Sequence, residues 1–102
     1  MKIVTIANPM DASKTISLVA RYENTRNGFR HVAETDDGVK AKCCYLNRTW
    51  ESYTYQTVLH RLAECWIRTK TGWNPNTKRD GAKFEEMYGR MVAEIDRNHG
   101  WM

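Results

Sequence analysis

Hydrophobic and polar residues alternate with a period of two along the first half of the chain, a pattern typical of half-buried β-strands. Turn residues separate the alternating segments, with Asn8-Pro9 after the first and Asn27-Gly28 before the third. The pattern therefore predicts strands at residues 2–7, 15–22, 29–35 and 39–46.

Residues 10–22 allow two interpretations. As a strand, residues 15–22 share one hydrophobic face, made of Ile16, Leu18, Ala20 and Tyr22. As a helix from Asp11, the segment would instead place Ile16, Val19 and Ala20 on one side. The β-branched residues of the segment favour the strand.

The register of the last two strands follows from the loop between them. A two-residue turn at Asp37-Gly38 would set the hydrophobic face of one strand opposite the polar face of the other. A three-residue loop with Gly38 in the left-handed conformation avoids this mismatch, and we prefer it. It predicts these cross-strand pairs: Thr35 with Val39, Ala33 with Ala41, His31 with Cys43, Phe29 with Tyr45 and, on the outer face, Glu34 with Lys40.

The second half of the chain changes to the 3.6-residue period of α-helices. Asn47 is a suitable N-cap for a helix from Arg48 to Thr71, and Gly72 ends it. The hydrophobic stripe of this helix is Tyr55, Val58, Leu59, Leu62 and Trp66, and its polar side is Gln56, His60, Arg61, Glu64 and Arg68.

A second helix runs from Lys78 or Asp80 to Asn98, and Gly100 follows it. Its hydrophobic stripe is Phe84, Met87, Tyr88, Met91 and Ile95. Gly89 lies inside this helix, where glycine costs about 1 kcal/mol relative to alanine. A close approach to the other helix or to a ligand would explain it, but ordinary packing is the preferred explanation.

These elements predict a single α+β domain over residues 1–102. It consists of a small antiparallel β-meander of three or four strands, followed by two C-terminal helices packed on one face. The exposed face of the sheet is expected to carry Arg30, Val32, Glu34, Lys40, Lys42 and Cys44.

The composition of the chain limits the classes of function that it is compatible with. The 102 residues carry a net charge of +4, which permits an acidic or nucleic-acid partner without requiring one. No segment approaches the roughly 18 apolar residues of a membrane span, so we expect no membrane partner. The odd number of cysteines (Cys43, Cys44 and Cys65) argues against a disulfide framework and favours a cytoplasmic location.

The search for catalytic and metal-binding patterns is mostly negative. The chain has no glycine-rich phosphate loop, no Gly-x-Ser-x-Gly and no His-Glu-x-x-His. His60 and Glu64 lie four residues apart, but a solvated helix face explains them better than acid–base or metal chemistry. His31 and Cys43 are two ligands, too few for a zinc site. We therefore expect no enzyme, no cofactor and no metal.

A basic segment with one aromatic residue joins the two helices, and it is the leading candidate for partner binding. With Asp80 as its one acid, it contains Arg68, Lys70, Trp73, Lys78, Arg79 and Lys83. Such a cluster around an exposed Trp73 would hold phosphates and stack a base, or it would bind an acidic protein surface. The competing interpretation is an ordinary charged loop with Trp73 folded back onto the core.

Three further aromatic residues, Trp50, Tyr53 and Trp101, lie off the main helical stripe. Trp50 fits best over the sheet edge, in the core, whereas an exposed Trp50 and Tyr53 would mark an interface. For Trp101 a docked tail and a subunit contact fit equally well, so a homodimer stays open.

Residues 45–51, Tyr-Leu-Asn-Arg-Thr-Trp-Glu, are followed by Tyr-Gln-Thr-Val-Leu at 55–59. This segment resembles a pattern found in small proteins of phages, plasmids and other mobile elements in Gram-positive bacteria. The resemblance carries no activity onto individual residues. It implies an accessory protein that binds a host or defence component, and anti-CRISPR proteins share its size range and its lack of catalytic motifs.

The expected function is therefore a non-enzymatic phage or mobile-element protein that binds and inhibits or modulates a host macromolecule in the host cytoplasm. A CRISPR-Cas effector with its guide RNA is the most specific candidate. The mild positive charge differs from that of DNA-mimicking inhibitors and favours contact with a nucleoprotein. The alternative is a small basic nucleic-acid-binding module.

Overall fold

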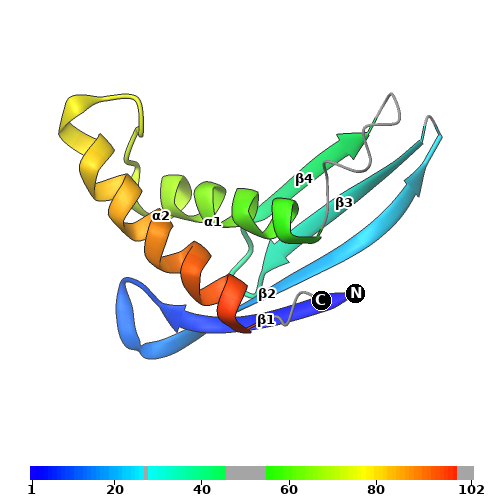
Figure 1. Cartoon of the computed structure of the whole chain (residues 1–102), viewed down its shortest axis with the longest axis horizontal. Coiled ribbons are helices and arrows are strands. Elements are labelled where there is room, and N and C mark those ends of the chain that lie inside the picture. Colours follow the sequence, from blue (N-terminus) through cyan, green and yellow to red (C-terminus); the bar gives the residue numbers. More distant parts are fainter. Residues whose placement is uncertain (27, 46–54, 99–102) are drawn as a thin grey trace.

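One antiparallel sheet and two helices make up the part of the chain that the computed structural model describes, residues 1–26, 28–45 and 55–98. For Thr25, Phe29 and residues 42–45 it describes only the backbone. The strands follow chain order in the sheet: β1 (Lys2–Asn8), β2 (Asp11–Thr25), β3 (Gly28–Thr35) and β4 (Lys40–Tyr45). The helices α1 (Tyr55–Thr71) and α2 (Lys78–Asn98) lie on the same side of the sheet (Figure 1). The predicted α+β meander with two C-terminal helices is confirmed.

The ambiguous segment, residues 10–22, is a strand from Asp11 onward and belongs to β2. β2 is longer at both ends than the predicted residues 15–22, because β1 pairs with its first half and β3 with its second half. Ile16, Leu18 and Ala20 are buried, and Tyr22, on the same face, is 47% exposed. The helix from Asp11 is therefore wrong.

The β3–β4 hairpin has the predicted three-residue loop. Gly38 has a φ of +100°, its N–H donates to the Thr35 carbonyl (3.1 Å), and the Thr35 N–H donates to the Val39 carbonyl (2.9 Å). Further along, the register pairs Ala33 with Ala41, His31 with Cys43, Phe29 with Tyr45 and Glu34 with Lys40, as predicted. In the preceding hairpin Thr25 pairs with Gly28, while Asn27 of the predicted turn lies outside the described residues.

Both helices bury the stripes that the periodicity predicts. α1 packs on β3 and β4, and α2 packs on β1 and on α1. The buried residues of the two stripes are Val58, Leu59, Leu62, Trp66, Phe84, Met87, Met91 and Ile95, with Tyr55 and Tyr88 half-buried at the margin. Gly72 ends α1 with a φ of +74°, and its N–H donates to the Arg68 carbonyl (3.0 Å). The predicted N-cap at Asn47 and helix start at Arg48 lie outside the described residues.

Side chains of α2 occupy the outer edge of β1. The Glu94 carboxylate accepts a hydrogen bond from the Ala7 N–H (2.9 Å), and the Asn98 side-chain amide donates to the Thr5 carbonyl (3.2 Å). Because unpaired strand edges recruit further strands, these contacts protect one side of the sheet from association.

Neither ordinary packing nor a close approach to the other helix explains Gly89. It is exposed in α2, and a Cβ placed there would meet no atom within 4 Å beyond its own helix. Gly89→Ala is therefore expected to raise the free energy of unfolding by about 0.5–1 kcal/mol, measured by urea denaturation. Gly81→Ala is the control, because its Cβ would lie 3.3 Å from the Pro75 carbonyl oxygen. Equal gains at both positions would contradict this explanation.

Candidate functional site

The loop between the two helices is fixed by Asp80, an acid that is only 4% exposed. Its carboxylate accepts hydrogen bonds from the Asn74 N–H (3.1 Å) and from the Arg79 guanidinium (3.2 Å), and both lower the pKa of Asp80. Its own N–H donates to the Thr77 hydroxyl (3.2 Å), and the Thr77 carbonyl accepts the first helical bond from Gly81. Thr77 is therefore the N-cap of α2, and the loop is tied to the helix that follows.

The six predicted binding residues lie at one end of the helix pair, and we call them the basic corner: Arg68, Lys70, Trp73, Lys78, Arg79 and Lys83. Arg68 and Lys70 come from the last turns of α1, and Lys78, Arg79 and Lys83 come from the start of α2. All five cations are exposed. Trp73 instead is half-buried against the core, with the Lys83 ammonium 6.0 Å from its ring centre. Of the two interpretations of Trp73, the structure is therefore closer to the folded-back one.

The cations of the basic corner differ in how far their charges are compensated. Lys70 pairs with Asp37 (3.2 Å), and Arg68 pairs with Glu64 one turn earlier in α1 (3.5 Å). Arg79 contacts Asp80 but is itself 86% exposed. In the described residues, Lys78 and Lys83 form no ion pair within 4 Å. These two lysines therefore carry the uncompensated charge of the corner.

Asp37, in the β3–β4 loop, accepts three hydrogen bonds that hold the loop and α1 together, and the sequence did not predict this role. It accepts hydrogen bonds from the Trp66 indole N–H (2.9 Å), from the Thr35 hydroxyl and from Lys70 (3.2 Å). Burial raises the pKa of Asp37, but these hydrogen bonds outweigh it and hold the pKa below its usual value. The available signal was Trp66 itself, because a buried indole N–H requires an acceptor.

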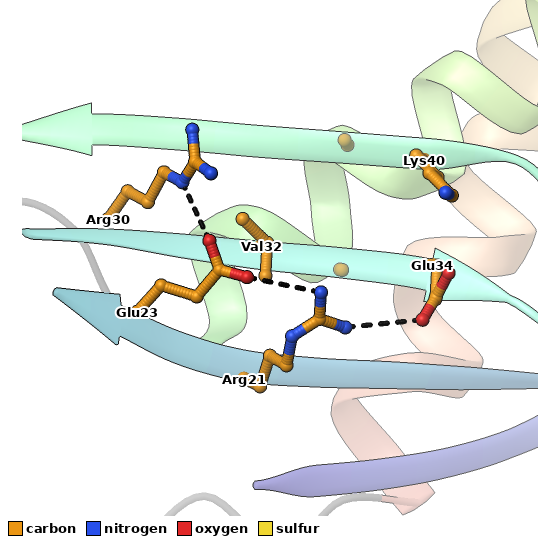
Figure 2. A pocket seen from close by; sticks show the side chains of 8 residues that line it. Arg21, Glu23, Arg30, Val32, Glu34 and Lys40 are labelled. Atoms are coloured by element: carbon orange, nitrogen blue, oxygen red, sulfur yellow. Dashed lines mark hydrogen bonds and ion pairs between the residues drawn. The ribbon is translucent and has the colours of Figure 1, made fainter. Parts of the chain in front are cut away.

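A row of linked charges crosses the outer face of the sheet (Figure 2). Arg30 binds Glu23 (2.8 Å), and Arg21 bridges Glu23 (3.1 Å) and Glu34 (3.2 Å). Glu34 lies opposite Lys40 in register, but its ion pair goes to Arg21 of the neighbouring strand. The row lines a shallow depression of about 350 Å³ that also includes Val32 and Lys40. Of the outer-face residues whose side chains are described, none is aromatic.

A second depression, of about 440 Å³, lies between the β3–β4 loop and the end of α1. Its lining is Asp37, Gly38, Val39, Lys40, Cys65, Arg68, Thr69 and Lys70. Lys40 lines this depression as well as the one on the sheet. Two cations of the basic corner, Arg68 and Lys70, therefore share a hollow with a lysine from β4.

His60 has a structural partner that its place on the polar side of the helix did not predict. Its Nε2 lies 2.7 Å from the Asp96 carboxylate, and Gln56 also donates to Asp96 (3.4 Å). The contact joins α1 to α2 in a half-buried position, so the expected solvated face is wrong at His60. Within residues 1–26, 28–45 and 55–98, no group of three or more His, Cys, Asp and Glu is arranged to hold a metal ion.

His31 lies in an aromatic cluster on the helix side of the sheet. Its ring packs edge-on against Tyr22 (5.6 Å between centroids) and Tyr55 (4.9 Å), and burial lowers its pKa. Its register partner is Cys43, whose side chain is not described. Trp50, Tyr53 and Trp101, the other aromatic candidates, lie outside the described residues.

Comparison with known proteins yields no relative. No protein-family model matches the chain, and neither does any curated protein or solved structure. Neither described helix combines the length and apolar character needed to cross a membrane.

Proposed function

We propose that this protein is a non-enzymatic binding protein that attaches through its basic corner to an acidic surface of a partner protein. The observation that supports this most is the pair of uncompensated cations, Lys78 and Lys83, at the start of α2. Both follow a loop that Asp80 and Thr77 hold in one conformation. Charges on a fixed support lose little entropy on binding and direct the approach of an oppositely charged partner.

The position of Lys78 adds to this argument. It is the first residue of α2, where the helix dipole disfavours a cation and favours an acid. A lysine there costs some tenths of a kcal/mol in stability. Residues that lower the stability of their own helix in this way are expected at functional sites, where binding of the partner offsets the lost stability.

A protein surface fits this corner better than a nucleic-acid base does. Stacking on the bases of a single strand depends on exposed aromatic rings. Trp73 is half-buried beneath Lys83, and the described side chains of the outer sheet face include no aromatic ring. The alternative function, a small nucleic-acid-binding module, therefore has less support as a base-stacking module at this corner.

The identity of the partner is the further part of the proposal. The resemblance of residues 45–59 to proteins of phages and mobile elements supports a host defence component, and a CRISPR-Cas effector with its guide RNA is the specific candidate. Binding would inhibit or modulate that effector. The net charge of +4 suits acidic protein surfaces.

The test is binding of purified host CRISPR-Cas effectors, loaded with guide RNA, to the immobilised protein. Lys78→Glu/Lys83→Glu is expected to weaken binding at least tenfold, because two attractive charges become repulsive. Lys14→Glu/Arg61→Glu is the control, since it makes the same change in net charge at exposed positions outside the corner. Binding that survives in the corner variant would contradict the assigned surface, and no binding by the unchanged protein would contradict the assigned partner.

A further inference from the structure

We infer that the depression between the β3–β4 loop and α1 binds the phosphodiester backbone of a single-stranded nucleic acid. This site shares Arg68 and Lys70 with the basic corner, but the protein-binding proposal above rests on Lys78 and Lys83, so neither proposal depends on the other. The depression, about 440 Å³, is within the range of ligand sites, roughly 300–1,000 Å³. We call it the phosphate pocket.

The charge of the pocket lining favours an anion. Three cations line it, Lys40 from β4 and Arg68 and Lys70 from α1, against one acid, Asp37. The Asp37 carboxylate already accepts hydrogen bonds from Thr35, Trp66 and Lys70, so it offers little to a further cation. The pocket therefore keeps a positive charge that its own residues do not cancel.

Two of the three cations are readily available to a ligand. The contact of Arg68 with Glu64 is 3.5 Å long and joins half-exposed side chains, and pairs of this kind are weak. Lys40 forms no ion pair within 4 Å in the described residues, because Glu34, its cross-strand neighbour, binds Arg21. Arginine and lysine are the residues that most often contact phosphate.

The end of a helix offers a competing explanation for part of this lining. Cations in the last turn of α1 interact favourably with the helix dipole, which accounts for Arg68 and Lys70 without a ligand. It does not account for Lys40, which belongs to β4 and lines the same hollow. The convergence of cations from two elements is what points to an anionic ligand.

The absence of aromatic residues from the lining decides which part of a nucleic acid would bind. Lys, Arg and Thr side chains contact phosphates, whereas reading of bases requires stacking or contacts to base edges. The phosphate pocket is therefore expected to bind without sequence preference and with a strong dependence on salt.

The test is fluorescence anisotropy with a short labelled oligonucleotide of mixed sequence, as single-stranded RNA and as DNA, over a salt series. Each phosphate contact contributes about 0.7 to the slope of log K against log salt. Lys40→Gln/Arg68→Gln is expected to reduce this slope by about 1.4. Lys78→Gln/Lys83→Gln removes the same charge outside the pocket and is expected to leave the slope unchanged. Unfolding midpoints of both variants should match the unchanged protein, because all four side chains are exposed.

Several results would overturn the inference: no binding by the unchanged protein at low salt, an equal loss of slope in both variants, or equally strong competition by an oligoglutamate of the same length. Equal effects with RNA and DNA would support recognition of the shared phosphodiester, and an effect confined to RNA would support the site with RNA as its occupant. The variant used to test partner-protein binding changes Lys78 and Lys83, so either proposal can fail alone.

Discussion

Replacing Asp37 by alanine is expected to lower the free energy of unfolding by about 1–3 kcal/mol. The change leaves the indole N–H of Trp66, a residue that is 1% exposed, without its acceptor. A buried donor without a partner costs about 1–3 kcal/mol. The Thr35 hydroxyl and the Lys70 ammonium lose the same acceptor, and this adds to the loss.

Asp36→Ala is the matched control for this prediction, because it removes the same charge one residue earlier. Asp36 is exposed, as Asp37 is, but its N–H donates to the Ser17 carbonyl, a backbone contact that alanine retains. The expected change is within about 0.5 kcal/mol. Urea denaturation at neutral pH measures both variants, and equal losses would show that Asp37 has no special role.

Acid should remove the stabilisation that Asp37 provides. Its pKa is lowered in the folded protein, so the carboxylate stabilises the fold at pH values above its unfolded pKa of about 3.9. The contribution is lost as the pH falls through the folded pKa. The difference in unfolding free energy between the unchanged protein and Asp37→Asn should therefore narrow between neutral pH and about pH 3. A constant difference over this range would contradict the assignment.

The local features of this fold could be predicted from sequence because they depend on neighbouring residues. The hairpin register follows from the alternation of residues 29–35 and from the conformation that Gly38 can adopt. The core faces of the helices follow from a period of 3.6 residues. Gly72 ends α1 because glycine readily adopts the positive φ that this position requires. Period and turn chemistry are both visible in short windows of the chain.

The contacts that were missed join residues far apart in the chain. The Trp66–Asp37, His60–Asp96 and Ala7–Glu94 contacts span 29, 36 and 87 residues. Each depends on how α1 and α2 lie on the sheet, which no single periodicity specifies. The length of β2 was missed for the same reason, since its ends are set by two different partner strands.

The candidate site was predicted only in part. Composition identified the cations between the helices, because charge is visible in sequence. It did not show that Trp73 packs against the core, or that Lys40 of β4 lines a hollow with Arg68. Both depend on tertiary structure.

Replacing Trp66 and replacing Trp73 should lower the free energy of unfolding by clearly different amounts. Trp66→Ala is expected to lower the free energy of unfolding by about 3–5 kcal/mol, because it opens a cavity in the core and leaves Asp37 without its indole donor. A small domain has only about 5–15 kcal/mol in total, so this variant should be largely destabilised. Trp73→Ala should cost clearly less, since Trp73 is only half-buried. Urea denaturation of both variants measures the difference.

Trp66→Phe separates the two causes of the larger loss. Phenylalanine keeps most of the buried ring and removes the N–H that Asp37 accepts. If the hydrogen bond matters as argued, Trp66→Phe and Asp37→Ala should be non-additive when combined, because each removes the same contact. Strict additivity would mean that Trp66 acts through packing alone. Equal losses at Trp66 and Trp73 would mean that the core extends to the basic corner, and Trp73 would then be a structural residue of the fold.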